Sequence, residues 1–571
     1  MLSSLKHRSS HEQQLELLSH AEDQTLPEHV VRTSRDDDEK EADVSTKSAN
    51  RVGCLDGLRG LACIAVFNYH FLWPWTAAVM LGHGAVTTRS PEPYNNLFSL
   101  PILCLLHRGR PMVAIFFAIS GYVLCRHVIQ AIQEHDFEAV RRKLSSAVFR
   151  RIFRLYIPPT ISMLLVAILA QLGAFPSEAL VYQGPGSAYI NGSLINAAYY
   201  KPCPKESTAV IGIDGVRDYF GVQTSTYLGG SITATERLCL DRLSQIASPV
   251  AMYEVIAQDK ARLSVRTDAS STRDTSPKRY WIEYGGSWEE HPIIFEDITW
   301  AVRNFTRTYA EWANPFNFNH YHPRYDPHTY TMPIELRGSM LIYIFLLGTM
   351  ALKTKWRLSF AGFFAAYSLA MGRWDMATFL GGAMISEMDI WASLRDASTM
   401  RTDVASHCRR NWILSQCSKM GRWAVFLLAL HFLSYPDVGA EFTPGFVFLS
   451  SFVPRYYLPL SGWMFYQSMG ALLLLPCIIR SSFISRLLGS SVAQYLGRIS
   501  FSLYLVHGPL LHSLGFWIMP RLFEHFGKAL GYLIGWVILF SITIYLAHWW
   551  HRRIDVWSTG IGKRLEMAVA A

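Results

Sequence analysis

The feature that most constrains this chain is a series of long apolar runs. A helix needs about 20 mostly apolar residues to cross the hydrocarbon core of a bilayer. The runs that meet or approach this length are residues 57–81, 111–132, 155–175, 334–353, 357–373, 374–393, 422–436, 459–479, 501–520 and 529–550. The sequence therefore predicts an all-α integral membrane protein with about ten transmembrane helices. Residues 442–453 are too few to span and are expected to be re-entrant or interfacial.

Composition agrees with a membrane protein. Only 17% of the residues are charged, whereas soluble domains average roughly 25%. The net charge of +9 is of the size that nucleic-acid-binding proteins carry, but the basic residues cluster in the segments between the predicted spans. That placement is typical of membrane topology, so no nucleic-acid partner is predicted.

Basic residues also orient the predicted spans, because short cytosolic segments are enriched in Lys and Arg. Residues 141–154, "RRKLSSAVFRRIFR", are strongly basic and contain no acidic residue. With ten spans and both termini in the cytosol, this stretch and the other basic clusters all fall on the cytosolic side. The predicted order is a disordered cytosolic tail (1–50), spans one to three (51–175), a lumenal or extracellular insertion (176–330), spans four to ten (331–555) and a cytosolic tail (556–571).

Two features fit a lumenal or extracellular location for the insertion. Asn191 and Asn304 begin Asn-x-Ser/Thr sequons, the acceptor sequence for glycosylation. Cys203 and Cys239 are the only cysteines of the segment. They either form a disulfide in an oxidising compartment or remain two separate thiols.

The first predicted span, which begins "DGLRGLACIAVFNYH", carries three ionisable residues. Arg59 and His70 are 11 positions apart, so they project from nearly the same helix face with an axial separation of roughly 16 Å. This layout suits a long ligand with an anionic head and a reactive tail. The alternatives are a topology-setting Arg59 and a His70 that bonds a neighbouring helix. Asp56 is expected to orient Arg59.

Three more ionisable residues lie at predicted helix ends. Arg151 and Arg154 share a face where span three begins, and paired guanidinium groups bind phosphate; anchoring at the cytosolic surface is the alternative. Glu335 lies at the exterior end of span four. It either caps that helix or acts as a carboxylate that orients a histidine or binds a substrate hydroxyl.

Ser120 and His507 are further candidates for the substrate site. Ser120 precedes Gly121 in "FFAISGY", where close packing of small residues is the simpler explanation. His507 lies inside span nine, and His512 is five residues further on, so the two are not expected to share a face well. No Walker loop, Gly-x-Ser-x-Gly elbow or His/Cys metal spacing occurs, and no metal is predicted.

Five motifs together resemble those of the acyltransferase 3 family of polytopic membrane acyltransferases. In chain order they are "LDGLRGLACIAVFNYH", "FFAISGYVL", "RRIFRLYIP", "YTMPIE" and "LGRISFSLYLVHG". The resemblance covers residues 54–175 and about 314–550, and the wording around "HTYTMPIELRGSM" is similar to the filamentous-fungal branch. It implies ten core membrane helices and transfer of an acyl group, usually acetyl, from acyl-CoA to a hydroxyl.

The resemblance also implies roles for individual residues. The family's arginine and histidine separated by ten residues fall on Arg59 and His70, and its Arg-x-x-Arg motif falls on Arg151 and Arg154. The first glutamate of its "WSLSVEEQF" motif falls on Glu335. Here the second glutamate is Leu336 and the tryptophan is Tyr330, so a role that needs paired carboxylates is not carried over.

Two classes of function remain at this point. In the first, acyl-CoA is a co-substrate, no cofactor is bound, the arginines hold the CoA phosphates, and His70 activates a hydroxyl. The acceptor is then a small metabolite, as in secondary metabolism, or a glycan or lipid acylated across the bilayer. In the second, the protein is a transporter or flippase that uses the buried His and Arg residues as a proton relay.

Overall fold

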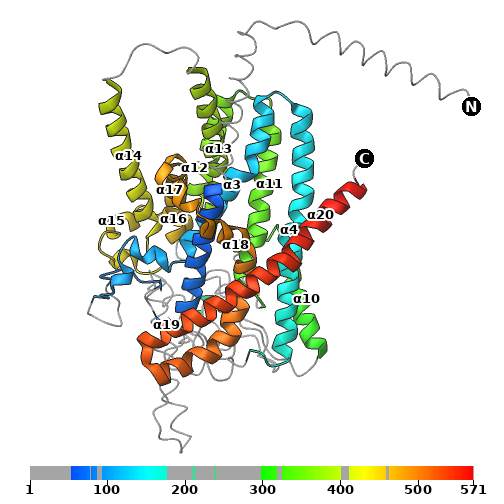
Figure 1. Cartoon of the computed structure of the whole chain (residues 1–571), viewed down its shortest axis with the longest axis vertical. Helices are drawn as coiled ribbons and strands as arrows, with labels where there is room; N and C mark the ends of the chain where they lie inside the picture. Colours follow the sequence, from blue (N-terminus) through cyan, green and yellow to red (C-terminus); the bar gives the residue numbers. More distant parts are fainter. Residues whose placement is uncertain are drawn as a thin grey trace, which may run out of the picture.

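The computed structural model describes residues 53–76, 79–85, 93–175, 210–211, 238–239, 298–317, 325–399, 410–457 and 462–569. The predicted tail 1–50, Asn191 and Cys203 lie outside these residues, and of Cys239 only the backbone is described. Long helices dominate the described residues, as Figure 1 shows. The only strands among them are β1 (Val210–Ile211) and β2 (Leu238–Cys239), which pair antiparallel with Val210 opposite Cys239.

The chain order of the helices follows the predicted spans. The first described helix covers residues 53–72. It is followed by α3 (Arg110–Gln133), α4 (Phe137–Gln171), α10 (Ile298–Ala313), α11 (Thr331–Thr349), α12 (Thr354–Ala370), α13 (Trp374–Thr399), α14 (Arg410–Leu433), α15 (Val447–Ser450), α16 (Gly462–Arg480), α17 (Ser482–Leu488), α18 (Ser491–Leu510), α19 (Phe516–Trp550) and α20 (Val556–Val569). Short 3-10 helices are η2 (Leu97–Ser99), η3 (Leu103–Leu106), η4 (Pro327–Tyr330), η5 (Ala440–Phe442) and η6 (Arg455–Tyr457), and π-helical turns are η7 (Leu511–Gly515) and η8 (His551–Asp555).

Helix α4 is longer than its apolar part. It begins at Phe137, where the side chain of the N-cap residue Asp136 accepts a hydrogen bond from the Ala139 backbone N–H. The basic stretch 141–154 was predicted to connect two spans, but it is helical. Arg151 and Arg154 therefore lie within a long helix and not where one begins. Hydropathy detects only the apolar part of such a helix, which explains the difference.

The C-terminal region corrects two further boundaries. Residues 501–520 were predicted as one span, but α18 ends at Leu510 and a π-helical turn separates it from α19. Within α19, Gly527 has φ 72° and ψ 170°, so the helix is broken there; glycine adopts this conformation at little cost. The segment 556–571 was predicted as a tail, but most of it forms α20, which continues the oblique run of α19 and lies against α4 (Figure 1). There Arg150 pairs with Glu566 at 3.1 Å.

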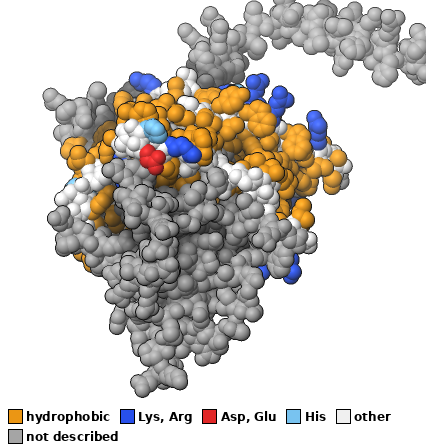
Figure 2. All heavy atoms as spheres, turned by 90° about the horizontal axis from the view of Figure 1, so that it is seen from below, with side chains coloured by type: hydrophobic (Ala, Val, Ile, Leu, Met, Phe, Trp, Pro, Cys, Tyr) orange, Lys and Arg blue, Asp and Glu red, His pale blue; other side chains and the backbone are white. Residues whose placement is uncertain are grey.

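Several helices have the length and apolar composition of membrane spans. Five described helical segments qualify: Arg110–Gln133, Phe137–Gln171, Pro327–Thr349, Gly462–Arg480 and the continuous segment Ser491–Val569. The face in Figure 2 is mostly hydrophobic where it is described, with few charged groups. Apolar side chains such as Phe363, Phe364 and Tyr367 of α12 are exposed. These observations indicate a helical membrane protein.

Close helix crossings are made by small residues. A Cβ atom at Gly121 of α3 would lie 2.2 Å from the carbonyl oxygen of Phe379 in α13. A Cβ atom at Gly60 would lie 2.6 Å from the backbone nitrogen of Gly497 in α18. Small residues allow membrane helices to approach in this way. The second crossing fixes the first helix against α18, and both helices contribute to the site described next.

Candidate active site

A cavity of about 460 Å³ lies between the first helix, α3, α4, α11 and α18. Its polar and charged lining includes most of the residues predicted from the sequence: Asp56, Arg59, Ser120, Arg151, Arg154 and Glu335. It also contains Arg498, His551 and Asp555. Apolar side chains such as Phe116, Phe117 and Phe501 complete the wall. A cavity of this size holds an elongated organic molecule.

Glu335 is held in the cavity wall by two neighbours. Its Oε1 atom accepts hydrogen bonds from Arg151 at 2.6 Å and from the Ser120 hydroxyl at 3.1 Å. Arg151 also donates to the Ser339 hydroxyl at 3.0 Å. Glu335 was predicted at the exterior end of its span and Arg151 at the cytosolic surface, but they are in contact. The two predicted depths therefore cannot both hold, because Arg151 lies inside the long helix α4 and Glu335 near the beginning of α11.

The arginines of the cavity differ in how they are neutralised. Arg59 lies 3.3 Å from Asp56, as the three-residue spacing predicted. Among the residues that the structure describes, Arg154 and Arg498 form no ion pair. Both are exposed as well as lining the cavity. The cavity therefore has an exposed cationic part at which an anion can bind without displacing a carboxylate.

The crossing of the first helix and α18 explains this arrangement. Gly60 and Gly497 pack against each other, and each is the immediate neighbour of an arginine, Arg59 and Arg498. Close contact of the two backbones therefore brings both arginines to the same cavity. In the sequence, Arg498 is only part of the motif "LGRISFSLYLVHG". Its place in the cavity wall depends on the contact between Gly60 and Gly497.

The inner part of the cavity reaches the beginning of α11 and the second half of α18. Thr331 and Tyr504 line it there, and their hydroxyls are 2.9 Å apart. The Tyr504 hydroxyl donates to the backbone carbonyl of His328 at 2.6 Å. Tyr504 thus separates the cavity from a group of histidines immediately behind it.

Three histidines from separate parts of the sequence meet behind Tyr504. The ring centres of His70 and His328 are 4.0 Å apart, those of His328 and His507 are 4.5 Å apart, and those of His70 and His507 are 5.3 Å apart. All three side chains are buried. We refer to His70, His328 and His507 as the histidine cluster. It contains the predicted residues His70 and His507 and the unpredicted residue His328.

Hydrogen bonds orient two rings of the cluster. The His507 Nδ1 atom lies 3.1 Å from the Leu503 carbonyl oxygen; because a carbonyl can only accept, Nδ1 carries the hydrogen. The His328 Nδ1 atom lies 3.3 Å from Oδ1 of the buried Asp326. Burial raises the pKa of the Asp326 carboxyl to about 8, and hydrogen bonds from the Ser162 hydroxyl and the His328 backbone N–H act in the opposite direction.

Local backbone geometry makes room for the cluster. A Cβ atom at Gly508 would lie 2.4 Å from Nδ1 of His328, so only glycine leaves space for that ring. The π-helical turn after Leu510 also brings His512 within 6.0 Å of the His328 ring centre. His507 and His512 were not expected to share a face, but the wider turn carries both to the same neighbour. Single π-helical turns occur often at functional sites.

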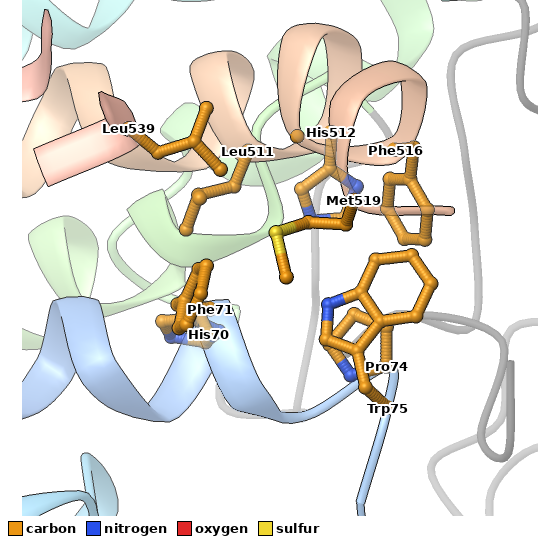
Figure 3. Close-up of a pocket in the computed structure, with 10 residues that line it drawn as sticks. His70, Phe71, Pro74, Trp75, Leu511, His512, Phe516, Met519 and Leu539 are labelled. Carbon is orange, nitrogen blue, oxygen red and sulfur yellow. The ribbon is translucent and has the colours of Figure 1, made fainter. Parts of the chain in front are cut away.

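A small void of about 10 Å³ adjoins His70 on the side of α19. Figure 3 shows His70, Phe71, Pro74 and Trp75 on one side and Leu511, His512, Phe516 and Met519 on the other. This volume matches one water molecule. The histidine cluster therefore has room for a small polar group beside His70, in a void whose other lining residues except His512 are apolar or glycine.

Two residues of the site were missed in the sequence, and one predicted site is corrected. His328 and Asp326 lie within the segment predicted as an insertion up to residue 330; a signal was available, since "DPH" directly precedes the "TYTMPIE" motif.

Asn304 lies within α10, is 3% exposed and accepts a hydrogen bond from the Tyr325 hydroxyl at 2.8 Å. A glycan on Asn304 is incompatible with that buried position.

The chain belongs to the acyltransferase 3 family of acyltransferases, and its apolar helices indicate a membrane protein. The family model, described as an acyltransferase domain, matches residues 52–200 and 280–549. This match includes every residue of the cavity and the cluster except His551 and Asp555. Residues 201–279 are not matched.

Curated relatives come from filamentous fungi, as the motif wording predicted. O-acetyltransferase PaAT-1 of Phomopsis amygdali is 24% identical, with 90% of this chain and 85% of that protein aligned. Acyltransferase R4 of a Phoma species is 22% identical, with 88% and 92% aligned. Acyltransferase clz18 of Cochliobolus lunatus is 24% identical, also with 88% and 92% aligned. No solved structure matches the chain.

Proposed function

We propose that this acyltransferase transfers an acyl group, acetyl in the first instance, from acyl-CoA to a hydroxyl. The observation that carries the proposal is that two sites of different character lie next to each other. An exposed cationic cavity lies beside a buried histidine cluster, and Tyr504 stands between them. An anionic donor with a long neutral arm and a terminal thioester matches this pair of environments.

The exposed arginines suit the phosphate end of the donor. Arg154 and Arg498 have no carboxylate partner among the described residues, and guanidinium groups bind phosphate oxygens in pairs of parallel hydrogen bonds. Arg59 supplies a third positive charge in the same cavity. With both termini cytosolic in a multi-pass protein, this part of the cavity opens to the cytosol, where acyl-CoA is found.

The arm of the donor then has to reach the histidine cluster. Arg59 and His70 lie on one helix, and 11 residues correspond to roughly 16 Å along its axis. A pantetheine chain extends over a distance of this order. The thioester is thereby brought to His70 while the phosphates stay at the arginines, which holds the reactants in position before the chemical step.

The proposed step is a single acyl transfer. His70 takes the proton of the acceptor hydroxyl, the oxygen attacks the thioester carbonyl, and a carbon–oxygen bond forms as the carbon–sulfur bond breaks. The departing CoA thiolate receives the proton, so the products are an ester and CoA thiol. His328, hydrogen-bonded through Nδ1 to Asp326, orients the neighbouring His70 ring, and Glu335 orients Arg151 by their ion pair.

The acceptor class is drawn from the relatives. PaAT-1 is named an O-acetyltransferase, and the other relatives are named acyltransferases. We therefore propose a hydroxylated small metabolite as the acceptor, with secondary metabolism as its setting. A glycan or lipid hydroxyl on the other side of the membrane is the second class to be tested.

The test is CoA release in membranes that contain the full chain. Membranes receive acetyl-CoA and a panel of hydroxylated metabolites, sterols and glycans, and free CoA thiol and acetylated product are measured. We expect acceptor-dependent CoA release that falls by about 10²–10⁴-fold in His70→Ala, the usual contribution of a general base. The control is His83→Ala, because the His83 ring bonds the Asn96 backbone carbonyl at 3.0 Å and does not line the cavity.

Two results would contradict the proposal. A His70→Ala protein that inserts normally and keeps full transferase activity removes His70 from the reaction. Uptake or export of an acceptor without any CoA release would instead support the transporter or flippase alternative, which leaves the donor intact.

A further inference from the structure

The histidine cluster has the composition of a metal site. One ring nitrogen of each of His70, His328 and His507 lies within 4.8 Å of those of the other two. These residues come from the first helix, η4 and α18, so only the fold brings them together. We infer that the cluster binds a divalent transition-metal ion, with Zn²⁺ as the ion best suited to it.

The ring positions are close to those required for a shared ion. Zinc–nitrogen distances of about 2.0–2.1 Å place the ring centres of two imidazoles on one tetrahedral ion about 5 Å apart. The ring centres in the cluster are 4.0, 4.5 and 5.3 Å apart. Movements of about 1 Å, within the range of side-chain rotation, bring the three nitrogens to the distances that zinc requires.

The outer hydrogen bonds are those that metal-binding histidines usually make. Such a histidine donates its second ring N–H to a carboxylate or a backbone carbonyl, which fixes the tautomer and the ring orientation. His507 donates Nδ1–H to the Leu503 carbonyl, and its buried Nε2 atom has no hydrogen-bond partner among the described residues. His328 places Nδ1 beside the Asp326 carboxyl. Two of the three rings are therefore oriented as zinc ligands are.

The ligand set also selects among ions. Imidazole nitrogen suits Zn²⁺ and similar transition metals, whereas Mg²⁺ and Ca²⁺ require oxygen ligands. Three protein ligands leave a fourth position for water or substrate, which is the arrangement of catalytic zinc sites. Asp326 lies beside His328 Nδ1 at 3.3 Å and is the outer-shell partner that holds this ring.

The proposed effect of the ion on catalysis rests on the proposed function, but ion binding does not. A hydroxyl at the open position of a zinc ion has a lowered pKa and loses its proton more easily. If the ion is bound, His70 is one of its ligands. The ion, and not the His70 ring, then activates the hydroxyl. Metal content and CoA release are separate measurements, so the two proposals fail separately.

The test measures zinc in the purified full-length chain in detergent. After removal of metal with a chelator, the protein is dialysed against Zn²⁺ and its metal content is determined by mass spectrometry. We expect about one zinc ion per chain, and a Co²⁺-loaded protein with the visible absorption of tetrahedral cobalt. Loss of one ligand in His507→Ala should abolish stoichiometric binding, and Asp326→Asn should weaken it by about 10–100-fold, as for other outer-shell partners.

His431→Ala is the matched control. His431 belongs to α14 and stacks on Phe446, and it is not one of the three residues of the cluster. It should keep about one zinc ion per chain. Zinc content well below one ion in the unmodified protein overturns the inference while CoA release continues to support the proposed function. Equal zinc binding in the unmodified protein, His507→Ala and Asp326→Asn also overturns it, and the unmodified protein gives a result even if a variant does not fold.

Discussion

The cavity and the histidine cluster lie side by side but are built in opposite ways. The cavity is large, partly exposed and lined by arginines with carboxylates between them. The cluster is enclosed, and the exposed fractions of His70, His328 and His507 are 9%, 2% and 0%. Charge and space suit the binding of an anion, whereas exclusion of water strengthens polar interactions at a reacting bond. Under the proposed function, the cavity recognises the donor and the cluster carries out the chemistry.

Buried arginines elsewhere show that charge alone does not mark a functional site. Arg357 is 1% exposed and donates from Nε to Glu387 at 2.7 Å. Arg126 lies 3.0 Å from Asp389, which also accepts from the Tyr122 hydroxyl. These ion pairs are not part of the lining of the cavity and connect α12 with α13 and α3 with α13. The cavity differs because Arg154 and Arg498 pair with no carboxylate in the part of the chain that the structure describes.

The largest effect on activity is expected from a substitution in the histidine cluster, the proposed site of the chemical step. In His328→Gln, the cluster loses the ring that links Asp326 to His70. We expect the turnover number for CoA release to fall by about 10²–10⁴-fold, with the Michaelis constant for acyl-CoA nearly unchanged. Steady-state kinetics in membranes, with His83→Gln as the control, measures both. An equal change in the Michaelis constant would show that the cluster also binds the donor.

A smaller effect on activity is expected from substitutions in the arginine-lined cavity, the proposed donor-binding site. Arg154→Ala and Arg498→Ala should each raise the Michaelis constant for acyl-CoA by about 10–100-fold, because each removes a charge-assisted hydrogen bond worth about 1.5–3 kcal/mol. The turnover number at saturating donor should change little. The control is Arg480→Ala, an exposed arginine at the end of α16 that does not line the cavity. A similar loss in Arg480→Ala would contradict the assignment.

The third prediction concerns the packing that holds the cluster together. In Gly508→Ala, the new methyl group would meet His328 Nδ1 at 2.4 Å and displace the ring. We expect turnover to fall by about tenfold, since a displacement of about 1 Å costs up to about 10²-fold. Gly348→Ala is the matched control, because no atom lies within 4 Å of a Cβ at that helical position. Equal activity of the two variants would show that the position of His328 is unimportant.

The sequence by itself determined the helical membrane character, the approximate positions of the long helices and the family. These depend on local patterns: apolar length, and the spacing of Arg59, His70, Arg151, Arg154 and Glu335. The shared face of Arg59 and His70 follows from helix geometry alone. Helix ends were less accurate, because α4 and α20 continue into polar sequence that hydropathy does not recognise.

Only the tertiary structure decided which residues meet. Asp326 and His328 belong to a segment that looked like an insertion, and they enter the site because Gly508 leaves room for an imidazole beside α18. The contact between Arg151 and Glu335 depends on how far α4 extends past α11. The approach of His512 depends on a π-helical turn. Contacts of this kind join residues far apart in the chain. They depend on the close packing of helix surfaces, which no local sequence pattern predicts.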